Sequence, residues 1–152
     1  MKGLGNDGQV RLRNVTIPGC LINDLRDLVS TEISIDGPRF GVQGGTDIDM
    51  EHSMVLPCFV DMHTHLDKGH IWPRAKNPDG TFMGALNTVM TDREANWVTK
   101  DVETRMEFAL KCAYAHGTRS IRTHLDSTAP QDAISWPVFD DIRARWAGRI
   151  DV

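Results

Sequence analysis

The sequence predicts an α/β protein in which a small β-rich module is followed by the first units of a parallel sheet with helices outside it, either doubly wound or closed into a (β/α)8 barrel. Short strands with turn residues between them fill the chain up to residue 53, an apolar run occupies residues 54–60, and strands and helices alternate afterwards. A continuous apolar run is typical of a buried parallel strand, and alternating strands and helices favour a parallel sheet. We therefore expect a β-rich module at 1–53 and barrel units at 54–152.

The first module is expected to contain three short strands, at residues 9–17, 31–35 and 46–50. Turn-forming residues separate them at Pro18-Gly19, Asp36-Gly37-Pro38 and Gly44-Gly45. The apolar run at 54–60 follows without a linker, and its composition predicts a strand buried on both faces.

Helical spacing appears beyond residue 80. A short helix is expected at 83–95, and Thr99 is expected to cap a second helix that Gly117 ends. A strand at 120–125 and a helix at 137–146 follow, and residues 149–152 resemble the start of another strand. A (β/α)8 barrel takes about 250 residues. We therefore expect the barrel to be incomplete in this chain.

Composition limits the kind of partner. The chain has 152 residues, 40% of them hydrophobic and 25% charged, with a net charge of -4. This composition is typical of a folded soluble protein, and without a basic stripe or a long apolar segment neither nucleic acid nor a membrane is an expected partner. The N-terminal residues lack signal-peptide features, so we expect a cytoplasmic protein. The three cysteines are widely spaced and are expected to be buried free thiols.

The segment Asp61 to Asp67 contains the pattern most suited to chemistry. Side chains alternate along a strand, so Asp61, His63 and His65 are expected on one side, at the end of the strand where sites in parallel α/β proteins lie. Two neutral imidazoles so placed can hold one divalent metal ion. A His-x-His pair also occurs by chance at strand ends, but the apolar strand and the acidic neighbours favour a metal site.

Three further residues are candidates around this pair. Asp61 or Asp67 could accept the free ring N–H of a ligating histidine, although a loop-capping role for Asp67 is equally compatible with the sequence. His124 ends the next expected strand and either lines the pocket or is hydrogen-bonded between strands. Large apolar side chains in the segment 69–97, three of them aromatic, either contact a planar substrate or anchor the segment to the core; the residues concerned are Trp72, Phe82, Met83 and Trp97.

The motif resembles the first barrel strand of the amidohydrolase superfamily, and its cytosine deaminase branch most closely. The residues concerned are Leu56-Pro57-Cys58-Phe59-Val60-Asp61-Met62-His63-Thr64-His65-Leu66-Asp67. The likeness continues through Gly80-Thr81-Phe82 to Ile121-Arg122-Thr123-His124-Leu125-Asp126, and the β-rich start resembles the small β-sandwich of these enzymes. Lys68 departs from the pattern of the bacterial cytosine deaminases.

The resemblance implies a hydrolase of non-peptide C–N bonds whose substrate is a small molecule. It would deaminate a cytosine-like heterocycle with a water molecule activated by one Zn or Fe ion. His63 and His65 would be two metal ligands, and the remaining ligands and the general acid and base would follow Val152. The alternatives are an amidohydrolase of N-alkyl triazines or cyclic amides, a non-catalytic truncated fragment, and a metal-binding regulatory β-domain. By itself the chain is expected to bind metal weakly, to be inactive, and to self-associate as a homo-oligomer through open strand edges.

Overall fold

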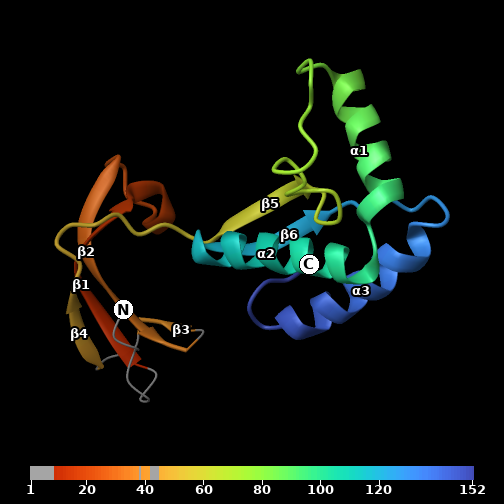
Figure 1. Cartoon of the computed structure of the whole chain (residues 1–152). Helices are drawn as coiled ribbons and strands as arrows, with labels where there is room; N and C mark the ends of the chain where they lie inside the picture. Colours follow the sequence, from red (N-terminus) through yellow and green to blue (C-terminus); the bar gives the residue numbers. More distant parts are fainter. Residues whose placement is uncertain (1–8, 38, 42–44) are drawn as a thin grey trace. The chain divides into compact units, whose positions relative to one another are not determined.

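The computed structural model describes residues 9–37, 39–41 and 45–152. The chain divides into two compact units, the first ending at Pro57 and the second beginning at Cys58. The strands and helices of each unit are labelled in Figure 1. Two of the expected turns, at residues 36–38 and 44–45, include positions outside the described residues.

The first unit is a four-stranded sheet with the strand order β3-β2-β1-β4. Its centre is an antiparallel pair, β1 (Gln9–Pro18) and β2 (Leu28–Asp36), joined by the 3-10 helix η1 (Gly19–Ile22). β3 (Arg39–Phe40) adds antiparallel to β2, and β4 (Thr46–Asp49) adds parallel to β1. The register of β1 shifts between Leu12 and Val15, where Asn14 takes a left-handed conformation that asparagine tolerates.

The second sheet of the expected sandwich-like first module is not found among the described residues. The described residues form a single sheet, because four strands supply one small apolar cluster centred on Val15, Ile17 and Val29. A sandwich would need a second sheet packed about 10 Å away on that face.

The second unit is built on a parallel pair, β5 (Phe59–Thr64) and β6 (Thr118–Thr123). The crossover between them contains α1 (Phe82–Asn96) and α2 (Thr99–Ala115), and α3 (Asp132–Trp146) follows β6. Asp151 forms a parallel bridge with Ser120, so the residues after α3 begin to pair as the next strand, as expected. This succession confirms a mixed α/β fold with a parallel sheet.

The core of the second unit lies between the two strands and the helices that pack on them (Figure 1). Helix α2 contacts both α3 and β6, and three of its residues that fall at helical spacing, Val102, Met106 and Leu110, are fully buried. The cluster is completed by side chains from the loop after β5, from the residue after α1, from β6, and from α3 and the turn that follows it, namely Leu66, Trp97, Ile121, Val138, Phe139, Ile142, Trp146 and Ile150.

The strand expected at 54–60 lies later in the chain, at Phe59–Thr64. Met54 instead makes an isolated bridge to Thr16 of the first unit, and Pro57 has no N–H to donate to a ladder. The expectation that this strand is buried on both faces is also wrong for the described residues. Phe59, Val60 and Met62 are more than half exposed, since β5 pairs there with β6 alone.

The ends of the helices differ from expectation in three places. The Thr81 hydroxyl caps α1 by accepting the Gly84 N–H at 2.9 Å, whereas the cap position of α2 is Val98 and Thr99 is already helical. Helix α3 begins at Asp132, before Pro137, because a proline in the second turn removes one hydrogen bond without ending the helix.

Two remaining expectations concern the cysteines and membrane spans. Cys20 and Cys58 are exposed free thiols rather than buried ones, because they lie in η1 and in the connection before β5, outside both apolar clusters. Within the described part of the chain, the helices are too short or too polar to cross a bilayer.

Candidate metal centre

Three histidine side chains meet at the carboxyl ends of β5 and β6. The backbone N–H of His124 donates to the carbonyl of Thr64 at 2.8 Å, which continues the parallel ladder past the strand ends. The ring centroids of His63 and His124 are 4.5 Å apart, and that of His65 is 5.4 Å from each of them. The structure therefore brings the two expected ligands together with the expected pocket residue.

Hydrogen bonds from backbone N–H groups to side-chain oxygens fix the strand end that carries these rings. The Asp61 carboxylate accepts the backbone N–H of His63 at 3.0 Å, and the Thr123 hydroxyl of β6 accepts the N–H of Leu66 at 3.0 Å. In this structure Asp61 thus contacts the histidine backbone rather than a ring nitrogen. Both bonds limit the freedom of the strand end from which His63 and His65 project.

The chemistry of His65 fits a metal ligand. Its Nδ1 is buried and has no hydrogen-bond partner in the described part of the chain. Burial, followed by the positive charge of Lys68, lowers the pKa of the His65 imidazole, which favours the neutral form that binds metals. Among the described residues, however, no group of three or more His, Cys, Asp and Glu side chains is arranged to hold an ion. His63 and His65 are a pair of donors, which is half of the tetrahedral set that zinc prefers.

Asp67 joins the loop after β5 to the loop after β6. Its side chain is fully buried, and its Oδ2 accepts the backbone N–H of Asp126 at 2.6 Å. The guanidinium of Arg105, on α2, donates to the carbonyls of Asp67 and Gly69. Burial raises the pKa of the Asp67 carboxyl. The contact that the structure shows for Asp67 is therefore the capping of a loop.

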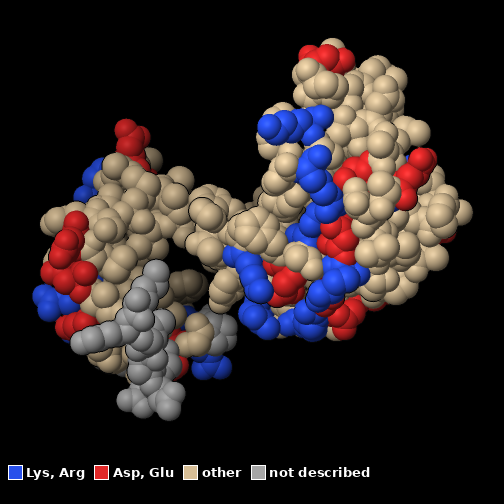
Figure 2. Space-filling model, viewed as in Figure 1, with Lys and Arg blue, Asp and Glu red and all other residues tan. Residues whose placement is uncertain are grey.

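A charged group that the sequence did not indicate lies beside the histidines. Asp126 accepts from the ammonium of Lys68 at 2.8 Å and from the guanidinium of Arg93, on α1, at 3.3 Å. In the sequence, the alternation of side chains along a strand places Asp126 on the same side as His124, and this is the signal that could have pointed to it. Elsewhere on the second unit basic and acidic side chains are interspersed, as the visible face in Figure 2 shows.

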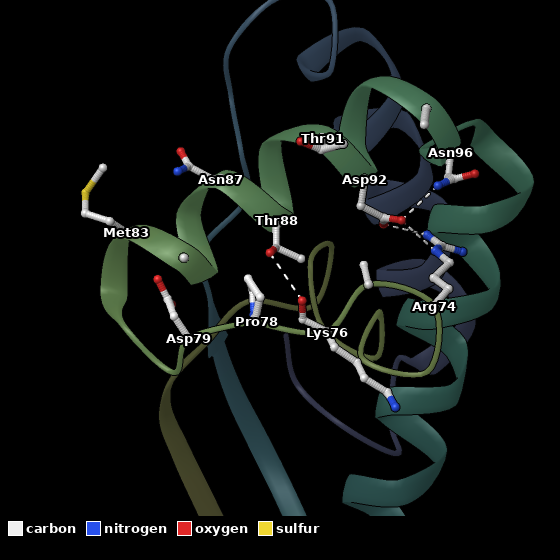
Figure 3. Close-up of a pocket in the computed structure, with 13 residues that line it drawn as sticks. Arg74, Lys76, Pro78, Asp79, Met83, Asn87, Thr88, Thr91, Asp92 and Asn96 are labelled. Atoms are coloured by element: carbon white, nitrogen blue, oxygen red, sulfur yellow. Dashed lines mark hydrogen bonds and ion pairs between the residues drawn. The ribbon is translucent and has the colours of Figure 1, made fainter.

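A pocket next to α1 is a separate feature (Figure 3). Arg74, in the loop before α1, donates to Asp92 at 2.8 Å through two of its nitrogens, and Asp92 also accepts from Asn96 and Trp97 at 2.8 Å. The charged groups at this end of the pocket are thus already paired. Of the four candidate side chains in segment 69–97, Trp97 anchors the segment to the core, whereas the other three are exposed.

A parallel βαβ unit with two histidines at the carboxyl end of its first strand is the arrangement that the resemblance to the amidohydrolase superfamily predicts. Relatives in sequence and in structure confirm this resemblance. The chain is 64% identical over 102 residues to a pterin deaminase of Rhizobium rhizogenes, a match that covers 67% of this chain. No protein-family model matches the sequence.

Solved structures share the fold. A 5-methylcytosine deaminase from Klebsiella pneumoniae, liganded with phosphonocytosine, aligns over 93% of this chain with a TM-score of 0.71 and 20% identity. An N-isopropylammelide isopropylaminohydrolase from Burkholderia multivorans aligns over 94% with a TM-score of 0.67 and 24% identity. The chain spans 23% of the pterin deaminase and 35% and 36% of these two structures.

Proposed function

We propose that this chain forms the metal-binding start of a (β/α)8 hydrolase that removes an amino group from a nitrogen heterocycle. The observation that carries the proposal is the meeting of His63 and His65 at the carboxyl ends of a parallel strand pair, in a chain 64% identical over 102 residues to a pterin deaminase. On this proposal, residues 58–152 supply the first strand–helix units of the barrel.

His63 and His65 would hold one Zn or Fe ion through neutral imidazole nitrogens. When bound, such an ion makes water a nucleophile at neutral pH. His124 would line the site, since the centroid of its ring lies 4.5 Å from that of His63 and 5.4 Å from that of His65. Asp61 and Asp67 would hold the backbone around the ligands by accepting N–H groups of His63 and Asp126. The remaining ligands and the proton-transfer groups would lie in a longer protein, beyond Val152.

We propose a pterin-like bicyclic heterocycle as the first substrate to test, because the sequence relative is named a pterin deaminase. A cytosine-like ring is the second candidate, favoured by the fold shared with a 5-methylcytosine deaminase. The fold shared with an N-isopropylammelide isopropylaminohydrolase favours an N-alkylated triazine as the third. Ammonia release distinguishes the first two from the third, from which an alkylamine would be released.

Two measurements test the proposal. Equilibrium dialysis against Zn²⁺ should show that the chain binds the ion and that His63→Ala and His65→Ala each weaken binding by about tenfold or more, whereas His116→Ala, at the end of α2, leaves it unchanged. Ammonia release should be absent from the 152-residue chain and present in the protein extended to the length of its relatives. Equal zinc binding by all variants, or deamination by the chain alone, would contradict the proposal.

A further inference from the structure

We propose that Asp126 is a positioning residue that holds the Lys68 ammonium at the histidine end of the sheet and, through Arg93, fastens α1 to the same end. The inference deepens the proposed function, on which the meaning of this location rests. The contacts themselves come from the chain's own residues and can be tested separately.

The geometry places Asp126 between three segments. Its Oδ1 accepts from Lys68, three residues after His65, at 2.8 Å, and its Oδ2 accepts from Arg93, in the last turn of α1, at 3.3 Å. Its own backbone N–H is held by the buried Asp67 carboxylate at 2.6 Å. One carboxylate thus joins the loop after β5, the loop after β6 and α1.

Burial makes these contacts more than surface ion pairs. The side chains of Lys68, Asp126 and Arg93 are 28%, 19% and 23% exposed. Charge-assisted hydrogen bonds in such partly buried positions are stronger than the screened pairs of an open surface. The two cations also share one carboxylate, so its removal leaves two partly buried positive charges beside each other.

The arrangement links the position of α1 to the position of Lys68. The segment between Lys68 and α1, residues 69–81, contains no helix or strand. Helix α1 contacts this edge of the sheet through Arg93, which donates to Asp126 and, at 3.5 Å, to the Thr128 hydroxyl. Asp126 therefore holds the Lys68 ammonium and the last turn of α1 at the same edge of the sheet.

The experiment uses the 152-residue chain and two residue-specific readouts, neither of which depends on metal or activity. The first is the rate of reductive methylation of Lys68 by mass spectrometry, relative to Lys100, whose side chain is 81% exposed. The second is amide hydrogen exchange in α1, relative to α2. The variants are Asp126→Asn, Asp126→Glu, Arg93→Gln and the control Asp141→Asn, which removes an exposed carboxylate of α3 paired with Arg145.

The expected pattern differs between variants. Asp126→Asn should raise the methylation rate of Lys68 and the exchange rate of α1, each by about three- to tenfold. Arg93→Gln should raise the exchange of α1 alone, because Lys68 keeps its acceptor. Asp126→Glu keeps a carboxylate, so both the Lys68 methylation rate and the α1 exchange rate should lie between those of wild type and Asp126→Asn. Asp141→Asn should change neither rate.

Unchanged Lys68 methylation in Asp126→Asn would overturn the proposal, as would unchanged α1 exchange in Arg93→Gln. An equal rise of exchange across α1, α2, β5 and β6 in both variants would also overturn it, since Asp126 would then act on overall stability. Zinc binding by the unaltered chain separates this result from a failure of the proposed function.

Discussion

Replacement of Asp92 by Asn should destabilise the second unit strongly. The Asp92 side chain is 3% exposed and accepts hydrogen bonds from Arg74, Asn96 and Trp97. The bonds with Arg74 and Asn96 are drawn in Figure 3, and together with the bond from Trp97 they tie the loop before α1, and the residue after its end, to α1 itself. An asparagine keeps one acceptor oxygen but turns an amide N–H₂ toward donors and removes the charge that Arg74 faces.

The magnitude follows from the surroundings of Arg74. Breaking a fully buried ion pair costs about 3–5 kcal/mol because one charge is left unpaired. Arg74 is 37% exposed and keeps Asp101 as a second partner, so solvent and that carboxylate compensate for part of the loss. We therefore expect Asp92→Asn to lower the free energy of unfolding by about 2 kcal/mol.

Urea unfolding followed by tryptophan fluorescence measures this change in the right part of the molecule, because Trp72, Trp97, Trp136 and Trp146 all lie in the second unit. The control is Asp141→Asn, which breaks an exposed pair and should cost less than about 0.5 kcal/mol. A loss for Asp92→Asn as small as that of the control would refute the assigned role of the Asp92 hydrogen bonds.

Three further predictions concern pH and packing. Burial opposes ionisation of Asp92, but its hydrogen bonds with Arg74 and Trp97 outweigh this and hold the pKa of the carboxyl below its ordinary 3.8. The difference in unfolding free energy between wild type and Asp92→Asn should therefore be complete above about pH 5 and shrink as the pH falls below 3.8. Urea unfolding at several pH values measures this difference. Ile142→Ala, at a fully buried position of α3, should cost about 2–5 kcal/mol in the same assay. Gly19→Ala should speed hydrogen exchange of β1 and β2 without affecting α2, because its Cβ would lie 1.9 Å from the carbonyl oxygen of Arg26.

The order of the helices and strands was predictable from the sequence wherever hydrophobic periodicity and composition agree. Val102, Met106 and Leu110 fall at helical spacing, and they are the fully buried face of α2. The incipient strand at 149–152 was recognisable because a helix and Gly148 precede it, and Asp151 does pair with Ser120. These features depend on neighbours a few residues apart, which a single sequence records.

Other features depended on contacts distant in sequence. Composition marked 54–60 as one strand, but Met54 pairs with Thr16 and the ladder of the second unit starts at Phe59. The hydrogen bonds of Asp126 with Lys68 and Arg93 join residues 58 and 33 positions apart. Periodicity cannot indicate such pairs, so the histidines were found as candidates while the charges beside them were not.

The most direct test of the central claim is histidine ring ¹⁵N NMR of the chain during titration with Zn²⁺. The account predicts that a ring nitrogen of His63 and one of His65 shift together at the same zinc concentration, while His52, His70 and His116 do not. Zinc-induced shifts confined to those three histidines, or no shift of His63 and His65 at saturating zinc, would contradict the assignment of the metal pair.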